Sequence, residues 1–426
     1  ALAAPAYAQT TVPMPPAPTL GPKAIPKFVD QLVIPPVYVP TAYVTDPFNL
    51  SRTIPYYEVD VKEYTQQILP TVDAKGKPTG FGPTTVWSYG GLTTLGTFAN
   101  SPGATFEVTR GTPIMVKWIN NLNASGKMLS HLFPVDPSIH WADPNNLGMM
   151  MPPPGGFPTT PPPFPPGFPN VQTPIPIVTH LHGGEVPSGS DGGPEQWWTQ
   201  NRIHGHDYNT TITTDPNAAV YYYPNEQLPT TLWYHDHALG ITRINVMSGL
   251  AGFYLLRDPN DPVAASLPSG AYEVPIVIQD RSFLANDPVT GNNEFWYDAI
   301  GIDPTVHPYW VPEFFGNTIM VNGKMWPNLN VEPTTYRFRL LDGSNARFYS
   351  LFFVDRVTKA VLPFTQIGTD GGYLGAPVPL TSLTIAPGER ADIIVDFSGL
   401  PVGTQILLRN NAKAPFPMGA APQGST

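Results

Sequence analysis

The stretch TTLWYHDH, residues 230–237, places two histidines, His235 and His237, at the end of an apolar run. The stretch PIPIVTHLHGG, residues 174–184, repeats this arrangement with a His-Leu-His motif. Both stretches predict β-strands, and each leads into a glycine turn. Side chains at positions i and i+2 of a strand leave the same face about 6.6 Å apart. That spacing suits two neighbouring metal ions that each take one imidazole.

The composition favours an all-β protein. The 426 residues include 55 prolines and 38 glycines, which interrupt helices and central strands and favour short strands joined by turns. Segments such as YYEVDVKEY (56–64) and TFEVTRGTPIMVKWINNL (105–122) predict strands, the second with a tight turn at Arg110–Gly111. We therefore predict an all-β fold with two β-sandwich domains.

Shifts in composition divide the chain into five parts. Residues 1–45 are rich in proline and alanine and predict an extended arm. The first sandwich domain is expected at 46–258, with a proline-rich insertion at 133–176 that forms a contact-ordered loop or a lid. The second sandwich domain is expected at 259–411. Residues 412–426 predict the start of a linker.

Charge and terminal composition limit the partners and the location. The net charge of −10, without a basic run, argues against a nucleic-acid surface. No stretch of about 20 apolar residues predicts a membrane span, and the absence of cysteine leaves no disulfide to report on redox compartment. The N-terminal ALAAPAYAQTT, with small residues at Ala6 and Ala8, is similar to the end of a signal peptide. We expect an exported protein; a plain disordered tail is the alternative.

A single His-x-His motif would ordinarily be interpreted as a pair of surface residues. Two such motifs, each in an apolar strand, favour metal binding instead. A ligand histidine usually needs a hydrogen-bond partner on its second ring nitrogen. Suitable side chains adjoin both motifs: Thr179 and Asp191 near the first, and Trp233 and Asp236 near the second.

The other histidines and a methionine run are weaker candidates. His204 and His206 lie in a polar stretch that predicts a solvated loop. Three consecutive methionines, residues 149–151, could bind Cu(I). A methionine run in a proline-rich insertion is more often incidental. We expect the three isolated histidines to be structural or exposed: His131, His140 and His307.

Longer segments around the motifs resemble the multicopper oxidases, in particular the bacterial branch with spore-coat laccases, bilirubin oxidases and phenoxazinone synthases. The resemblance spans roughly residues 45–420. It implies tandem cupredoxin-like Greek-key β-sandwiches, with a three-copper cluster between the first and third domains and a blue copper in the third. It is carried by THLHGGEVPSGSDG, LWYHDHALGITRINVMSGLAGFYLLRD, VNGKMWPNLNVEPTTYRFRLLDGSNARFY and IAPGERADIIVDF.

The resemblance also implies roles for individual residues. His180 would bind the type 2 copper and His182 a type 3 copper, while His235 and His237 would bind the type 3 pair. Asp191 matches a carboxylate that helps deliver protons during dioxygen reduction, a step that consumes four protons.

The chain departs from the family pattern in one large respect. The other cluster histidines and the blue-copper ligands belong to the family's third domain, which this sequence does not contain. We expect that domain on a separate or cleaved polypeptide that docks here; a truncated relic is the alternative.

The resulting functional prediction is the N-terminal part of a laccase-like oxidase. It would take single electrons from phenols, aromatic amines or metal ions, pass four to dioxygen, and be inactive without the C-terminal domain. A copper-free cupredoxin-like scaffold and a zinc hydrolase are the alternatives, and the hydrolase lacks further ligands in register.

Overall fold

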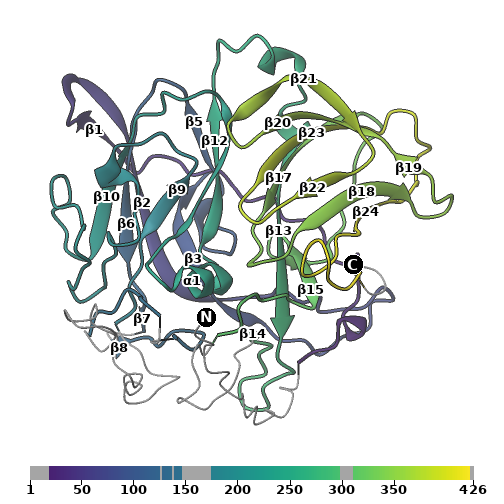
Figure 1. Cartoon of the computed structure of the whole chain (residues 1–426), viewed down its shortest axis with the longest axis horizontal. Coiled ribbons are helices and arrows are strands. Elements are labelled where there is room, and N and C mark those ends of the chain that lie inside the picture. The colour runs from purple at the N-terminus through teal and green to yellow at the C-terminus, as the bar shows by residue number, and fades with distance from the viewer. Residues whose placement is uncertain (1–18, 125–126, 137–138, 146–173, 298–309, 423–426) are drawn as a thin grey trace, which may run out of the picture.

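The structure of the protein is a computed structural model, almost all β, in which two pairs of sheets lie side by side (Figure 1). This arrangement confirms the all-β class and the tandem sandwiches that the sequence predicts. No helix among the residues described below is long and apolar enough to cross a membrane. The described residues are 19–124, 127–136, 139–145, 174–297 and 310–422.

The first half of the chain forms one pair of sheets, a two-stranded hairpin and short helices. These elements are η1 (Pro22–Ala24), β1 (Ala42–Asp46), β2 (Asn49–Gln66), β3 (Thr84–Thr93), β4 (Gly96–Phe98), β5 (Phe106–Thr109), β6 (Ile114–Asn120), β7 (Asn123–Ala124), β8 (Lys127–Met128), β9 (Thr179–His182), η2 (Ser188–Ser190), β10 (Ala218–Tyr223), β11 (Thr230–Asp236), α1 (Thr242–Ser248) and β12 (Ala251–Arg257).

An aromatic core joins the two sheets of the first half. One sheet has the order β10-β6-β2-β3-β4, with β1 paired to β2, and the other has the order β5-β12-β11-β9. The ring centroid of Tyr234 on β11 lies 5.0 Å from that of Tyr89 on β3 and 5.3 Å from that of Trp118 on β6. Because successive side chains leave opposite faces of a strand, burial of Tyr234 in this core turns Trp233 and His235 to the other face.

The second half forms the other pair of sheets. Its elements are η3 (Ala264–Ser266), η4 (Gly270–Tyr272), β13 (Glu273–Phe283), β14 (Phe295–Trp296), β15 (Thr318–Val321), β16 (Lys324–Met325), β17 (Thr335–Asp342), β18 (Tyr349–Asp355), β19 (Val361–Leu362), β20 (Phe364–Thr369), β21 (Gly372–Leu380), β22 (Leu383–Ile385), β23 (Arg390–Asp396) and β24 (Ile406–Asn410).

Phenylalanine side chains pack the sheets of the second half. The larger sheet has the order β16-β15-β13-β17-β23-β20-β21, with β14 on β13, and the smaller has β19-β18-β22, with β24 on β18. The ring of Phe353 on β18 lies 5.6 Å from that of Phe364 on β20 and 6.4 Å from that of Phe338 on β17. This core holds β17 and β23 next to the first half of the chain, where both strands reach the histidine motifs.

The turn predicted at Arg110–Gly111 carries the chain from one sheet to the other. β5 pairs in parallel with β12, whereas β6 pairs with β2 and β10. Gly111 has a φ of +75°, which glycine adopts without the steric cost that a Cβ would bring. Its N–H donates to the carbonyl of Asn225. The two strands are therefore sequence neighbours that do not pair with each other.

The described part of the N-terminal arm runs along both halves. The N–H of Leu20 donates to the carbonyl of Phe283, and the N–H of Tyr38 donates to that of Thr105. The first strand begins at Ala42, slightly before the arm boundary predicted at residue 45. The arm is thus held to both sandwiches by main-chain hydrogen bonds.

The described parts of the predicted insertion contain no strand or helix. The indole nitrogen of Trp310 donates to the carbonyl of Pro134 at 2.7 Å, and the ring of Phe133 lies 5.8 Å from that of Tyr297. This irregular segment is therefore held by contacts with the second half of the chain. The methionine run at 149–151 lies outside the described residues.

The described end of the chain folds back on itself. Ala414 and Ala420 exchange main-chain hydrogen bonds, and the ring of Phe416 stacks on that of Phe348 at 4.7 Å. This segment, predicted as the start of a linker, therefore packs against the second sandwich.

Candidate metal centre

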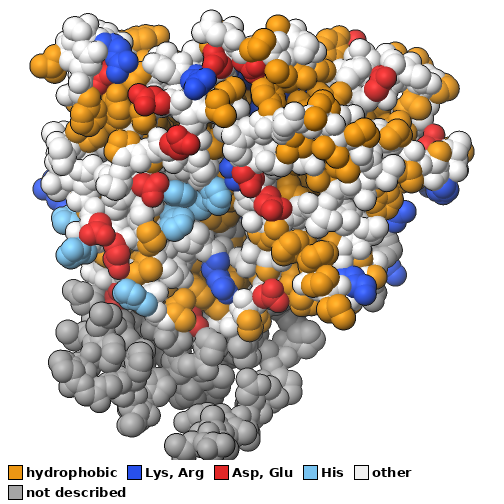
Figure 2. Space-filling model, turned by 45° about the horizontal axis from the view of Figure 1, so that its top comes forward, with side chains coloured by type: hydrophobic (Ala, Val, Ile, Leu, Met, Phe, Trp, Pro, Cys, Tyr) orange, Lys and Arg blue, Asp and Glu red, His pale blue; other side chains and the backbone are white. Residues whose placement is uncertain are grey.

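Antiparallel pairing of β9 with β11 brings the two histidine motifs together. His180 lies opposite His235 in this ladder. The ring centroid of His180 lies 5.6 Å from that of His235 and 4.9 Å from that of His237, and the centroid of His182 lies 5.3 Å from that of His235. The four imidazoles therefore gather on one face of the sheet. Figure 2 shows a group of histidine side chains near the centre of one face of the molecule.

Main-chain carbonyls fix the orientation of two of the rings. The Nδ1 atom of His180 lies 2.6 Å from the carbonyl oxygen of Asp191, and the Nδ1 atom of His235 lies 2.7 Å from that of Asp236. Because a carbonyl oxygen can only accept, each Nδ1 carries the ring proton. The Nε2 atoms of His180 and His235 therefore keep their lone pairs, as a metal ligand must.

The other two rings complete a set of nitrogen donors. The Nδ1 atom of His182 lies 3.1 Å from the Nε2 atom of His235, so His182 donates to His235 in the metal-free chain, a contact that an ion bound at this Nε2 atom would replace. The Nδ1 atom of His237 is buried and has no hydrogen-bond partner, which is an unfavourable state for a polar atom unless something else engages it. The cluster thus holds ring nitrogens suited to copper, zinc, iron or nickel.

Burial lowers the pKa of three of the four rings. Desolvation, followed by the nearby charge of Arg390 and the neighbouring imidazoles, lowers the pKa of His182 to about 4. Desolvation also lowers the pKa of His235 and that of His237. Since a metal binds the neutral imidazole, these rings are in their ligand form at neutral pH.

The spacing of the rings limits how many of them one ion can contact. Within the described residues, no three His, Asp or Glu side chains converge closely enough to hold one ion. Neighbouring imidazole centroids in the cluster are 4.9 to 5.8 Å apart, a separation that suits adjacent ions. The four rings would therefore supply only some of the ligands that each ion needs.

Two of the side chains expected to support the rings make other contacts instead. The hydroxyl of Thr179 lies 3.3 Å from a tyrosine hydroxyl, and the carboxylate of Asp236 accepts from the N–H groups of Val178 and Ala238 and from Asn245. The expectation was wrong for both side chains, because a residue next to a ligand in a strand points to the opposite face. Asp236 supports the rings only through its carbonyl.

Trp233 packs on the rings rather than hydrogen-bonding to them. Its centroid lies 4.1 Å from that of His235 and 5.1 Å from that of His182. Its indole nitrogen is buried without a partner. The tryptophan therefore limits how far these two imidazoles can turn.

Asp191 lies between the cluster and solvent. One carboxylate oxygen is 3.5 Å from the Nδ1 atom of His180, and the side chain is 43% exposed. The hydrogen bond to that ring is made by the main-chain carbonyl of Asp191, so the carboxylate can exchange protons with water.

Three other histidines lie outside the cluster. His206 is exposed and pairs with Asp207, and the ring of His204 stacks on that of Tyr208 at 4.7 Å. His140 is exposed as well. These positions agree with the surface roles expected from the sequence.

His131 is buried, and both of its ring nitrogens lack a hydrogen-bond partner. Desolvation lowers its pKa to about 3, so it is a neutral core residue, which agrees with the structural alternative expected for it. His307 lies outside the described residues.

A cavity of about 470 Å³ adjoins the cluster. Its walls include His182, His235 and His237 from the first half, and Arg281 and Gly388 from the second. The imidazoles therefore face a space that admits small molecules and is bounded by both sandwiches.

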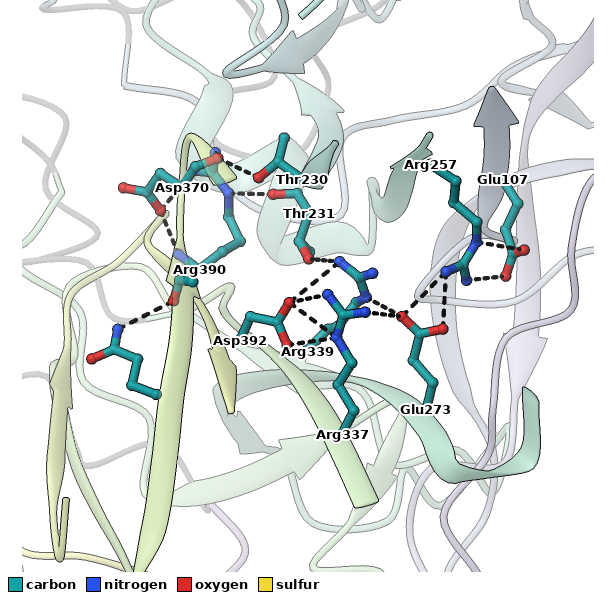
Figure 3. A network of polar contacts seen from close by, with 12 residues as sticks. Glu107, Thr230, Thr231, Arg257, Glu273, Arg337, Arg339, Asp370, Arg390 and Asp392 are labelled. Carbon is teal, nitrogen blue, oxygen red and sulfur yellow. Dashed lines mark hydrogen bonds and ion pairs between the residues drawn. The ribbon is translucent and has the colours of Figure 1, made fainter. Parts of the chain in front are cut away.

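A buried ionic network joins the two sandwiches (Figure 3). Glu273 on β13 pairs with Arg257 at the end of β12 at 2.9 Å and with Arg339 on β17 at 2.5 Å. Arg339 also donates to the hydroxyl of Thr231 on β11 at 2.8 Å. Buried charges are tolerated when they are paired in this way, so the network fixes β11 against the second sandwich.

Sequence reasoning missed Arg390, which begins β23 and is buried. Its Nε atom donates to the carbonyl of Thr231 at 2.9 Å. The available signal was a charged residue at the start of the apolar strand RADIIVD (390–396), since arginine is seldom buried unless its donors are satisfied.

Comparisons with known proteins agree with this geometry. No protein-family model matches the chain. The laccase of Bacillus subtilis (strain 168) is 36% identical over 389 residues, which cover 91% of this chain and 62% of the laccase. Multicopper oxidase LPR1 of Arabidopsis thaliana is 37% identical over 338 residues, which cover 79% of this chain and 49% of that oxidase.

A solved structure shows the same fold. The laccase from Pediococcus acidilactici superposes with a TM-score of 0.58 at 23% identity, over 91% of this chain and 60% of that protein. This chain thus spans between about half and three fifths of the length of the relatives named here. Its similarity to laccases and other multicopper oxidases over most of its length shows that the chain belongs to the multicopper oxidase family.

Proposed function

We propose that this chain supplies part of the copper cluster of a laccase-like multicopper oxidase. Such an enzyme couples the one-electron oxidation of phenols, aromatic amines or metal ions to the four-electron reduction of dioxygen to water. The observation that carries the proposal is the set of four imidazoles, from β9 and β11, that face one another. Copper would supply the electron transfer, for which imidazole is a suitable ligand.

Each histidine has a proposed role. His180 would hold the type 2 copper, His182 would hold a type 3 copper, and His235 and His237 would bind the type 3 pair. The orientation of His180 and His235 by main-chain carbonyls supports Nε2 as their ligand atom. Trp233, packed on two of the rings, would resist their displacement when an ion binds.

The remaining ligands are proposed to come from outside these 426 residues. The support is that the four imidazoles give fewer than three converging ligands for any one ion in the described part of the chain. We propose a further cupredoxin domain, outside these 426 residues, that completes the cluster and carries the blue copper with its thiolate. Oxidation of a phenol would then require both parts.

Asp191 is proposed to deliver protons. Reduction of one dioxygen to two waters consumes four protons, and a carboxylate near the cluster can pass them from solvent. Its half-exposed side chain, 3.5 Å from His180, supports this role. The copper-free scaffold is not favoured, because such a protein would gain nothing from burying an imidazole nitrogen without a partner, as in His237.

Export of the protein is also part of the proposal. It is supported by the small residues Ala6 and Ala8, which suit signal-peptide cleavage. Fractionation of the producing cells tests it: recovery of the protein with the cytosolic marker enzymes would contradict export.

The function is tested on protein purified from its source with copper present. We expect bound copper and oxygen uptake that depends on an added phenol. Oxygen uptake with a phenol by these 426 residues alone, a species of 46.3 kDa, would contradict the need for further ligands. Absence of copper and of oxygen uptake in the complete assembly would contradict the oxidase itself.

A further inference from the structure

We propose that Arg390 of the second sandwich is a positioning residue for the histidine cluster of the first. The inference builds on the proposed copper-binding role of that cluster. Arg390 begins β23, and its side chain is 3% exposed. From there it reaches the strand and the turn that carry His235 and His182.

The guanidinium group is held on three sides. Its Nε atom donates to the carbonyl of Thr231 at 2.9 Å, Nη1 donates to that of Gly388 at 2.9 Å, and Nη2 donates to that of Asp370 at 3.2 Å. A planar guanidinium presents these donors in a fixed fork, which the single ammonium of lysine cannot reproduce. One side chain therefore sets the relative positions of three separate main-chain segments.

The first of these segments leads directly to a proposed ligand. Thr231 lies on β11, four residues before His235, and its side-chain hydroxyl accepts a hydrogen bond from Arg339. Arg390 takes the main-chain carbonyl of the same residue. The start of β11 is thus fixed against the second sandwich from both its main chain and its side chain.

The turn after His182 lies against the same guanidinium. A Cβ at Gly183 would lie 2.7 Å from Nη2 of Arg390, and Gly183 has a φ of +82°. A Cβ at Gly388, whose carbonyl Arg390 holds, would lie 3.4 Å from Cε1 of His182. His182 is the last residue of β9 and pairs with Trp233. The turn beyond it is held by Gln227, which donates to the carbonyl of Gly183, and by its contact with Arg390.

Asp370 holds Arg390 through both its carboxylate and its main-chain carbonyl. Its carboxylate accepts from the main-chain N–H of Arg390 at 2.6 Å and lies 3.2 Å from the guanidinium. Its carbonyl accepts from the hydroxyl of Thr230 at 2.9 Å as well as from Arg390, as Figure 3 shows. The arginine is therefore tied to both sandwiches before it contacts the turn after His182.

These contacts explain how two imidazoles from different strands are kept in register. The nitrogen atoms of His182 and His235 lie 3.1 Å apart, and Arg390 contacts the backbone on the approach to each ring. Replacement of the guanidinium by an ammonium would keep the positive charge but remove the packing contact with the turn after His182.

The test compares Arg390→Lys with a matched control, Arg339→Lys. Both variants keep a buried positive charge and lose a guanidinium that contacts Thr231, but only Arg390 touches the turn after His182. Long-range ¹H–¹⁵N spectra of the metal-free protein would report the His182–His235 hydrogen bond. We expect the ring signals of His182 and His235 to shift or double in Arg390→Lys. In Arg339→Lys the same signals should remain as in the wild type.

Copper affinity gives the second readout. Cu(I) is titrated anaerobically against a chromophoric chelator. Because loss of an outer partner typically weakens metal binding about 10- to 100-fold, we expect a loss of that size in Arg390→Lys. The control should stay within about 3-fold of the wild type, as expected for a residue that orients no ligand. If Arg390→Lys preserves both the ring signals and the copper affinity of the wild type, the positioning role is overturned.

A second variant keeps the test decisive if Arg390→Lys does not fold. If thermal unfolding shows that Arg390→Lys is not native, Asp370→Ala is measured instead. This variant removes the half-exposed carboxylate that holds Arg390, and it should shift the ring signals of His182 and His235. Unchanged signals in Asp370→Ala would then overturn the inference. If wild-type protein in its complete assembly binds no copper, the proposed function fails, while the ring spectra still decide the positioning role.

Discussion

The Nδ1 atom of His182 and the Nε2 atom of His235 lie 3.1 Å apart, although the two residues are 53 positions apart in the sequence. The partners in this contact come from different motifs, because the β9–β11 ladder brings the rings together across the sheet. The two histidines within one motif are separated by the pleat of the strand instead. An ion shared between two imidazoles would therefore bridge the two strands.

Removal of one ring should stop dioxygen reduction. His237→Ala deletes an imidazole whose buried Nδ1 atom has no partner within the protein. We expect copper content to fall and oxygen uptake to drop to background, while any blue colour of a separate copper persists. Metal analysis, the oxygen electrode and the visible spectrum check this. His206→Ala, at an exposed position, is the control; equal loss in both variants would contradict a ligand role for His237.

Asp191→Asn should slow turnover without releasing copper. The hydrogen bond to His180 comes from the main chain, so the amide leaves the ring in place and removes only the proton carrier. General acid–base groups contribute about 10²- to 10⁴-fold, and we expect a fall in turnover within that range. Asp207→Asn, another exposed carboxylate beside a histidine, should have no effect. Unchanged turnover of Asp191→Asn across pH would refute the proton-delivery role.

Acid should destabilise the fold through His131. Burial lowers its pKa from 6.5 to about 3, so below pH 6.5 the unfolded chain binds a proton that the folded chain does not. Stability is therefore lost as pH falls through this window, by at most about 1.4 kcal/mol per pH unit. His131→Phe should remove about 2 kcal/mol of the loss between pH 7 and pH 5 in urea unfolding. Parallel pH profiles for the two proteins would show that this histidine is not responsible.

The ionic network between the sandwiches should contribute strongly to stability. Glu273 pairs with Arg257, Arg337 and Arg339 and is nearly inaccessible. Glu273→Gln would leave Asp392 as the remaining carboxylate partner of the buried Arg337 and Arg339, and loss of one member of such a buried network costs about 3–5 kcal/mol. Glu107→Gln removes the more exposed partner of Arg257 and should cost less than about 1 kcal/mol. Urea unfolding compares the two; equal effects would contradict the importance of burial.

Much of the centre could be predicted from the sequence because side chains carry the pattern. The apolar runs before His182 and His235 predicted strands, and the i, i+2 spacing placed both rings of each motif on one face. The meeting of the two motifs on one face depends on the pairing of β9 with β11, which the structure supplies.

Other features had no signature in the sequence. The partners of His180 and His235 are carbonyl oxygens, which every residue possesses. The position of Arg390 beside the turn after His182 depends on how the two sandwiches dock, and no local pattern encodes that geometry. The passage of the chain between sheets at Gly111 likewise depends on long-range strand pairing.

Anomalous diffraction at the copper edge, from crystals of the copper-loaded protein with its complete assembly, tests the central claim most directly. The account predicts anomalous peaks within bonding distance of ring nitrogens of His180, His182, His235 and His237, with further ligands from outside these 426 residues. Copper bound elsewhere, with these four rings turned away from every peak, would contradict it.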